Sequence, residues 1–437
     1  MMIQPQEKVS AGAFDRIDPP DPKLYLDCIH CGFCLPTCPT YLVLGNEMDS
    51  PRGRLSLIRT ASEGKIGISD SFVKHMDLCL LCRACETACP SGVKFGSLME
   101  TARGQVGRRY QHPAAERRFR DVILRTFTDL GRLRTLTSLL RLYQRSGLQR
   151  LIRASGLLSF FGRLGRMEAL LPSIPDPRLY VLPEVTPAKG QRRWRVGLLL
   201  GCVQRFFFAH VNAATVRVLS ENGYEVIAPK DQSCCGSLLV HEGEREQGKI
   251  KARRIIDCFE SANVDYIVVN AAGCGSAMKE YWELFQTDPT YAKRAEVFSK
   301  KVRDVSELLA GLPLYGQLQP LNLTVTYHDA GHLAHGQKIR QEPRALLKQI
   351  PGLRFVELKE SDFCCGSAGI YNLLHPDAAQ QLLDRKIERI KETGVEVVVS
   401  GNPGCSLQIE KGLKERGLQI RVVHPVELLA WSYRGME

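Results

Sequence analysis

Two cysteine runs with the same spacing are the residues of this chain best suited to metal chemistry. Each has the form Cys-x2-Cys-x2-Cys-x3-Cys-Pro, and together they hold eight of the sixteen cysteines: Cys28, Cys31, Cys34 and Cys38, then Cys79, Cys82, Cys85 and Cys89. Three thiolates on one tight loop can bind three irons of a four-iron cluster, whereas the fourth cysteine is carried towards a neighbouring cluster. The spacing therefore predicts two [4Fe–4S] clusters.

The same geometry predicts that the two runs exchange their last cysteines. We expect one cluster to be held by Cys28, Cys31, Cys34 and Cys89, and the other by Cys79, Cys82, Cys85 and Cys38. Zinc also takes four thiolates, but a third cysteine at the same interval and a terminal Cys-Pro in both runs fit zinc poorly. Because every iron would have a protein ligand, the pair favours electron transfer over catalysis.

An internal repeat in the second half of the chain carries seven further cysteines. Each copy opens with an apolar segment, WRVGLLLGC at 194–202 and LTVTYHDAG at 323–331, and closes with SELLA or VELLA. Between these lie a Cys-Cys-Gly motif and a second apolar segment that ends in a cysteine. Alternating strands and helices predict parallel sheets in βαβ units, with ligand sites at the carboxyl ends of the strands. Cys202, Cys274 and Cys405 fall at such ends.

The two copies differ in their candidate ligands. The first has four, enough for a third iron–sulfur cluster: Cys202, Cys234, Cys235 and Cys274. The second has only Cys364, Cys365 and Cys405, because Gly331 stands in the place of the first cysteine. Its site is therefore three-coordinate by cysteine, completed by another group, or degenerate.

Three histidines lie in the sequence near Gly331, the position where the second copy lacks a cysteine. His328, His332 and His335 are candidates for metal ligation or for proton exchange with a quinone, and the alternative is that they are ordinary polar residues at a turn and helix start. The remaining cysteine, Cys258, lies in a helical pattern and is expected in the core.

The arrangement of these motifs predicts a multidomain chain. We expect an α-helical domain of the two-cluster type at 20–105, an Arg-rich helical segment with a Pro-rich linker at 106–190, and two α/β domains with parallel sheets at 191–315 and 320–437. Within the Arg-rich segment, apolar residues at helical spacing predict short amphipathic helices. Four glycines are expected to break them: Gly131, Gly147, Gly156 and Gly162.

Most of the positive charge of the chain is concentrated in one place. Residues 103–178 contain sixteen arginines, no lysine and five acidic residues, whereas the whole chain has a net charge of +12. Such a segment is a solvated helical face, a membrane-surface element, as LLSFFGRLGRM at 157–167 suggests, or a docking surface for an acidic partner. A nucleic-acid-binding protein with structural clusters is a remote alternative, because no base-stacking aromatic pattern accompanies the charge.

The sequence also bears on the cellular compartment. The first ten residues lack the pattern of a secretory signal, so thiolates for metal are favoured over disulfides. No stretch of about 18 apolar residues occurs. We expect a cytoplasmic protein, or one bound peripherally to the inner face of the cytoplasmic membrane.

The order and spacing of these motifs resemble those of one family. CIHCGFCLPTCPTYLVLGNEMDSPRGRLSLIR, then CLLCRACETACP, then two Cys-Cys-Gly domains, resemble the iron–sulfur subunit of glycolate oxidase, from about residue 20 to the end. Subunits of lactate-oxidising systems, anaerobic glycerol-3-phosphate dehydrogenase and heterodisulfide reductase share this layout. The chain departs from the heterodisulfide-reductase type, since Cys274 and Cys405 are not followed by a Cys-x2-Cys partner, and from the family pattern at Gly331.

The resemblance implies a redox role within a complex. FAD-containing partner subunits would oxidise glycolate to glyoxylate, and this chain would pass the electrons towards a membrane quinone. No GxGxxG or Walker-type loop follows a strand, so the flavin is expected on the partner and no dehydrogenase activity from this chain alone. The alternative is the same relay role for a D-lactate or glycerol-3-phosphate flavoprotein.

Overall fold

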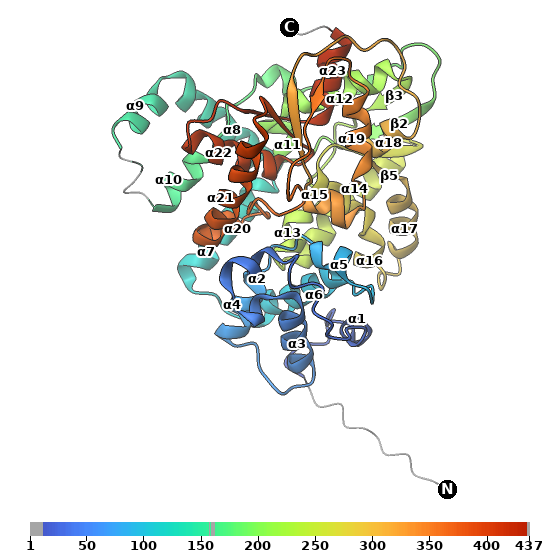
Figure 1. Cartoon of the computed structure of the whole chain (residues 1–437). Coiled ribbons are helices and arrows are strands. Elements are labelled where there is room, and N and C mark those ends of the chain that lie inside the picture. Colours follow the sequence, from blue (N-terminus) through green and yellow to red (C-terminus); the bar gives the residue numbers. More distant parts are fainter. Residues whose placement is uncertain (1–11, 157, 159–161, 435–437) are drawn as a thin grey trace.

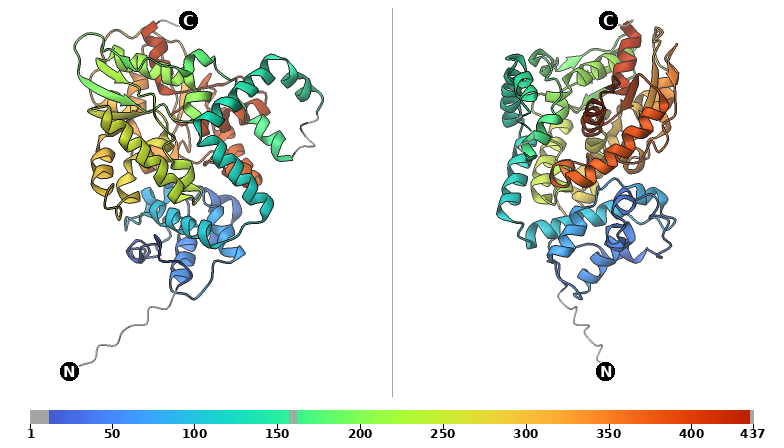
Figure 2. Two further views of the ribbon diagram at one scale, coloured as in Figure 1. Left: turned by 180° about the vertical axis from the view of Figure 1, so that it is seen from behind. Right: turned by 60° about the vertical axis from the view of Figure 1, so that its left-hand side comes forward.

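The computed structural model describes residues 12–156, 158 and 162–434. An N-terminal helical domain lies against one end of two α/β domains, and a helical arm projects from their side (Figures 1 and 2). Part of the segment 157–167 lies outside the described residues.

The N-terminal domain consists of short helices joined by the two cysteine loops. Its elements are α1 (Pro22–Leu26), α2 (Pro39–Leu44), η1 (Glu47–Asp49), α3 (Pro51–Ser62), α4 (Asp70–Asp77), α5 (Ala84–Ala88) and α6 (Phe95–Arg109). Ile58, Met76 and Leu98 are fully buried between α3, α4 and α6. Pro39 occupies the first turn of α2, directly after Cys38, because a helix start tolerates the missing N–H of proline.

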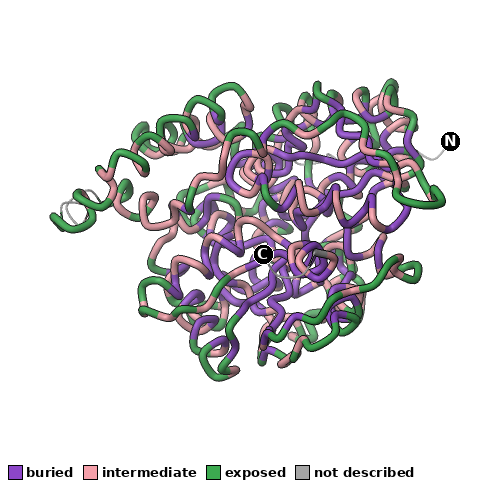
Figure 3. Tube along the Cα trace, turned by 90° about the horizontal axis from the view of Figure 1, so that it is seen from above, coloured by how far each residue is buried: buried purple, intermediate pink, exposed green. Residues whose placement is uncertain are grey.

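The Arg-rich segment forms the projecting arm. It consists of α7 (Ala114–Phe127), α8 (Leu130–Arg145), α9 (Leu148–Ala154) and α10 (Gly162–Ala169), followed by η3 (Pro177–Tyr180). Short helices were predicted here, but Gly131 does not break them. It lies in the first turn of α8, which begins after Asp129, whose carboxylate accepts the N–H of Arg132. Figure 3 shows that the outer part of the arm is mostly exposed.

The first α/β domain contains a five-stranded sheet in the order β1-β3-β2-β4-β5, in which only β1 is antiparallel to its neighbour. The strands are β1 (Val185–Thr186), β2 (Trp194–Leu198), β3 (Tyr224–Ile227), β4 (Tyr266–Val269) and β5 (Val302–Asp304). The helices are α11 (Val203–Phe207), α12 (Ala209–Glu221), α13 (Ser237–His241), α14 (Arg245–Ser261), α15 (Ala272–Lys279), α16 (Tyr281–Leu284), α17 (Ala292–Lys301) and α18 (Val305–Ala310).

The second α/β domain repeats this topology with a parallel sheet in the order β7-β6-β8-β9. The strands are β6 (Thr324–His328), β7 (Arg354–Phe355), β8 (Val397–Ser400) and β9 (Arg421–Val423). The helical elements are the π-helical turn η4 (His332–Gly336), α19 (Gln341–Lys348), α20 (Tyr371–Leu374), α21 (Pro376–Thr393), α22 (Pro403–Glu415) and α23 (Pro425–Arg434). The equivalent strand orders confirm the predicted duplication.

The two α/β domains share one hydrophobic core. Val196 on β2, Val325 on β6 and Leu428 on α23 are fully buried and belong to the same cluster. The helices pair reciprocally across this core, α12 with α23 and α18 with α19. The two domains therefore pack as a pseudo-symmetric pair, which brings their equivalent strand ends close together.

Candidate metal centres

Four cysteines from both runs surround one hollow in the N-terminal domain. Cys38, Cys79, Cys82 and Cys85 line this hollow together with Arg54. Cys38, the last cysteine of the first run, thus lies with the first three cysteines of the second. The ligand set itself remains a prediction.

The cysteine loops have an unusual backbone that the two runs share. The residue before the second cysteine and the residue after it adopt positive φ in both: His30 (55°) and Gly32 (85°), then Leu81 (51°) and Arg83 (65°). Non-glycine residues adopt this conformation at an energetic cost, and such strain clusters at functional sites. The positive φ angles turn each loop tightly around its cysteines, and the N–H of Leu81 points at the sulfur of Cys79 at 3.4 Å.

The other predicted cluster would lie closer to the surface. Cys28, Cys34 and Cys89 are partly buried and pack against the core of the N-terminal domain, whereas Cys31 is exposed. Burial raises the pKa of the Cys34 thiol.

The four cysteines of the first α/β domain converge at the carboxyl ends of its strands. The sulfurs of Cys202 and Cys234 are 3.7 Å apart, and the side chain of Cys235 interacts with those of Cys234 and Cys274. Contact with Cys234 and burial raise the pKa of Cys202 well above its usual value. The Cys202 thiol is therefore protonated when no metal is bound, and its binding to a metal would release a proton.

The Cys-Cys-Gly motif needs its glycine in both copies. Gly236 has φ of 82°, and a Cβ there would lie 2.7 Å from the carbonyl oxygen of Gly248. Gly366 has φ of 85°, and a Cβ there would lie 2.6 Å from the carbonyl oxygen of Ala379. In each copy the two cysteines can thus turn inward while the backbone packs against the following long helix.

The second α/β domain brings three cysteines and one histidine together. One ligand atom each of His328, Cys365 and Cys405 lie within 4.8 Å of one another, and all three residues are buried. The side chain of Cys364 interacts with that of Cys365. Gly331, which replaces the fourth cysteine, packs instead against the backbone of Cys82.

The three histidines suggested by the sequence are separated by the fold. Only His328 lies beside the sulfurs. The ring of His332 packs against that of His241 of the first α/β domain, with centroids 4.8 Å apart and planes tilted by 38°, and Nδ1 of His335 is 2.8 Å from the hydroxyl of Thr87 in the N-terminal domain. His332 and His335 therefore belong to contacts between domains rather than to this site.

The loop of the second cysteine run contacts both α/β domains. A Cβ on Gly331 would lie 2.7 Å from the carbonyl oxygen of Cys82. Arg83, between Cys82 and Cys85, forms an ion pair with Glu280 and is 3.4 Å from the hydroxyl of Ser276, two residues after Cys274. The hollow in the N-terminal domain thus lies close to both repeated sites.

The two repeated sites also meet through one side chain. The amide nitrogen of Asn402 is 3.4 Å from the sulfur of Cys405, and its amide oxygen accepts the N–H of Gly273 at 3.3 Å. Gly273 precedes Cys274, so Asn402 bridges the two cysteine loops. Asn402 could not be identified from the repeat, because Ala271 stands at its position in the first copy.

Two further findings concern residues outside these centres. Cys258 lies in α14, as predicted, but its side chain is only partly buried, so the expectation of a core cysteine is wrong.

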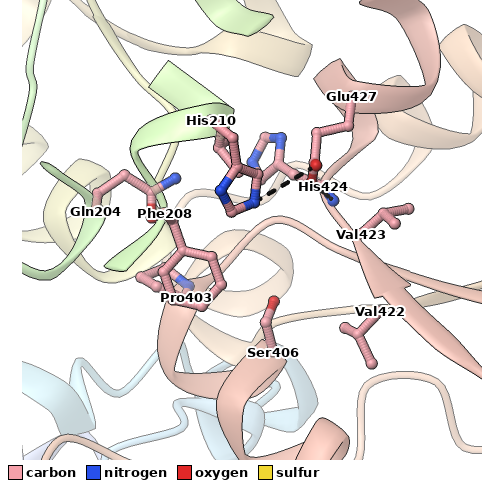
Figure 4. Close-up of a pocket in the computed structure, with 10 residues that line it drawn as sticks. Gln204, Phe208, His210, Pro403, Ser406, Val422, Val423, His424 and Glu427 are labelled. Carbon is pink, nitrogen blue, oxygen red and sulfur yellow. Dashed lines mark hydrogen bonds and ion pairs between the residues drawn. The ribbon is translucent and has the colours of Figure 1, made fainter. Parts of the chain in front are cut away.

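A separate small pocket opens between the α/β domains, with His210, His424 and Glu427 around it (Figure 4). Among the described residues, no helix is both long and apolar enough to cross a membrane.

Fold and sites together define an iron–sulfur protein with an N-terminal dicluster domain and a duplicated cysteine-rich domain. The model of a 4Fe-4S dicluster domain matches residues 25–93, and that of a cysteine-rich domain matches twice, at 196–279 and 325–410. The model of the linker region of the glycolate oxidase iron-sulfur subunit matches residues 115–171.

Relatives of similar length identify the particular family. The probable glycolate oxidase iron-sulfur subunit of Bacillus subtilis is 40% identical over 412 residues, which are 92% of this chain and 93% of the relative. The glycolate oxidase iron-sulfur subunit of Escherichia coli is 34% identical over 87% of this chain and 89% of its own. Lactate utilization protein A of Exiguobacterium is 32% identical over 54% of this chain and 96% of its own. The chain belongs to the family of glycolate oxidase iron–sulfur subunits.

Proposed function

We propose that this chain relays electrons from a flavoprotein that oxidises glycolate to glyoxylate towards a membrane quinone. The observation that carries the proposal is that the second-run loop contacts both cysteine-rich domains. Cys82 packs against Gly331 of the second domain, and Arg83 contacts Ser276 and Glu280 of the first. Iron–sulfur clusters accept and donate single electrons, and their potentials depend on hydrogen bonds and burial. The hollow is lined by the guanidinium groups of Arg54 and Arg83, each of which is also paired with a carboxylate.

The two proposed sets of four cysteines in the N-terminal domain are each suited to bind a [4Fe–4S] cluster. Each offers four thiols on loops whose backbone turns around them. The four cysteines of the first cysteine-rich domain are a third candidate set, in which the sulfurs of Cys202 and Cys234, 3.7 Å apart, would have to separate to bind different irons. Two clusters correspond to about eight irons per chain and three to about twelve, so iron and sulfide counts on anaerobic protein decide the number.

We further propose that the helical arm contacts the flavoprotein partner. It coincides with the region matched by the glycolate oxidase linker model, and it exposes apolar side chains beside its arginines: Leu139, Leu142, Leu148 and Leu151 are 46–68% exposed. Liposome flotation separates this role from membrane binding. Recovery that rises with the anionic lipid fraction would contradict partner docking as the function of the arm.

A lactate-oxidising flavoprotein is the second candidate donor, because a lactate utilization protein matches half of the chain. Stopped-flow reduction distinguishes the donors. With each flavoprotein and its own substrate present, the clusters of this chain should be reduced faster by the glycolate-oxidising partner. Equal or faster reduction by the lactate-oxidising one would overturn the assignment.

A further inference from the structure

The second cysteine-rich domain has no room for the cysteine that its first copy uses. At Gly331 a Cβ would lie 2.7 Å from the carbonyl oxygen of Cys82 and 3.4 Å from its Cα. Contacts below 3.0 Å require the neighbouring atoms to move, and here those atoms are the backbone of a cysteine loop. A fourth ligand at this site must therefore come from another position.

His328 occupies such a position. It ends β6, three residues before Gly331, and is 1% exposed. Neither of its ring nitrogens has a hydrogen-bond partner, although the carbonyl of Ser361 lies close to the ring. A buried polar group without a partner costs about 1–3 kcal/mol, so this ring lacks a partner that it needs. The equivalent residue in the first copy is Leu199, where Cys202 is present.

The spacing of the donor atoms decides between a single ion and a cluster. Zinc lies about 2.3 Å from thiolate sulfur and about 2.0–2.1 Å from imidazole nitrogen, so two donors on one ion are at most about 4.6 Å apart. In a four-iron cluster each thiolate binds a different iron, which holds the sulfurs farther apart. One donor atom each of His328, Cys365 and Cys405 lies within 4.8 Å of the other two, near the spacing of ligands on one ion, whereas Cys364 lies outside this group and contacts Cys365.

The surroundings balance the charge of such a site. Three thiolates and one divalent ion have a net charge of −1. The ammonium of Lys386, 1% exposed, lies near Cys364 and Cys365 and donates to the carbonyl oxygens of Glu360 at 2.6 Å and Ser361 at 3.1 Å. A buried charge is tolerated when it is paired and hydrogen-bonded.

We propose that His328, Cys365 and Cys405 bind a single zinc ion and that the sulfur of Cys364, beside Cys365, turns in as the fourth ligand of a Cys3His site. Zinc favours four-coordinate tetrahedral sites of cysteine and histidine, and such closed sites contribute to folding. Because zinc has no redox chemistry, the site would not carry electrons. Its role would be structural: it holds the cysteine loop of the second domain against Cys82.

Metal analysis of the full chain, purified without oxygen, tests this site. The wild type is expected to hold about one zinc per chain besides its iron and sulfide. His328→Ala should lose that zinc and keep its iron and sulfide, whereas His328→Cys should keep both. His332→Ala, which removes a partly buried histidine not beside the sulfurs, is the matched control and should retain zinc. Wild-type protein without zinc, or loss of iron and sulfide in His328→Ala, would overturn the proposal.

A second readout does not depend on the folding of His328→Ala. Zinc X-ray absorption should show three sulfurs and one nitrogen around the ion in the wild type and four sulfurs in His328→Cys. Four sulfurs in the wild type would exclude His328 as a ligand. Failure of glycolate-dependent reduction with an intact zinc shell would count against the proposed relay and leave the zinc site standing.

Discussion

Cys38 connects the two cysteine runs through a single side chain. It lines the same hollow as Cys79, Cys82 and Cys85. Serine is a poor ligand for iron, so Cys38→Ser should damage the cluster of the second run, with loss of up to about four irons per chain. EPR of the reduced protein resolves the two clusters. Cys89→Ser is the matched variant and should damage the other cluster. Damage confined to the first-run cluster in Cys38→Ser would refute the exchange.

Gly331 allows close contact between the N-terminal domain and the second cysteine-rich domain. A Cβ there would press on the carbonyl oxygen of Cys82 at 2.7 Å, and overpacking of this kind costs about 1–3 kcal/mol. Gly331→Ala should therefore lower the apparent melting temperature by several degrees and shift the spectrum of the nearby cluster. Gly67→Ala, where a Cβ would meet nothing within 4 Å, is the control. Equal melting temperatures for the two variants would show that the contact is not tight.

At the scale of the secondary-structure elements, Arg54 joins α3 to α2, which follows the first cysteine run, and to η1 and α4. Its fully buried guanidinium donates to the carbonyl oxygen of His75 at 2.7 Å and the hydroxyl of Thr40 at 3.0 Å, and pairs with Asp49 at 3.3 Å. Loss of Arg54 leaves the buried carboxylate of Asp49 with Nδ1 of His75, 2.9 Å away, in place of its cationic partner, and breaking a buried pair costs up to about 3–5 kcal/mol.

Arg54→Met should accordingly make the N-terminal domain lose its clusters at a much lower denaturant concentration, as followed by visible absorbance. Arg59→Met in the same helix is the control, because the Arg59 side chain is 46% exposed and pairs with Glu63 at the surface. That variant should behave like the wild type. Similar midpoints for both variants would show that Arg54 contributes no more than a surface pair.

The start of α23 carries a pH-dependent contact between the α/β domains. Burial raises the pKa of Glu427 to about 7, although its carboxylate accepts the N–H of His424 at 2.7 Å, and Nε2 of His210 lies 3.5 Å away (Figure 4). Between pH 4.5, its ordinary pKa, and pH 7 the folded state binds more protons than the unfolded state. The contribution of Glu427 to stability therefore decreases as the pH rises through this range.

Glu427→Gln keeps the acceptor for His424 and removes the titration. The difference in apparent melting temperature, variant minus wild type, should increase between about pH 5 and pH 7 and stay constant above pH 7. Thermal unfolding at a series of pH values measures the difference. A difference that is the same at every pH would mean that Glu427 is not titrating in this range.

The elements differ in how far the sequence could predict them. The duplicated strands and the cysteines at their carboxyl ends follow from local patterns, since apolar segments and neighbouring motifs report on the same βαβ unit. Lys386, Asn402 and Glu427 carried no such signal, because their partners are distant in the sequence and meet only after the domains pack. Histidine spacing was misleading for the same reason: His332 turns towards His241 of the first α/β domain, and His335 turns towards Thr87 of the N-terminal domain.

At the scale of the whole molecule, the second-run loop lies where three domains meet. The N-terminal domain supplies that loop, and the two cysteine-rich domains each contact it beside their own cysteine sites (Figure 1). The arm projects away from this junction, which leaves it accessible to another subunit (Figure 2). The arrangement separates the proposed docking surface from the proposed electron path.

Anaerobic reduction by glycolate is the most direct test of the proposed relay. With the glycolate-oxidising flavoprotein present, glycolate should bleach the visible absorbance of this chain and produce EPR signals of reduced clusters. Without the flavoprotein, glycolate should leave the chain oxidised, and a dye acceptor should not be reduced. Oxidation of glycolate by the isolated chain, or clusters that stay oxidised when flavoprotein and glycolate are both present, would contradict the account.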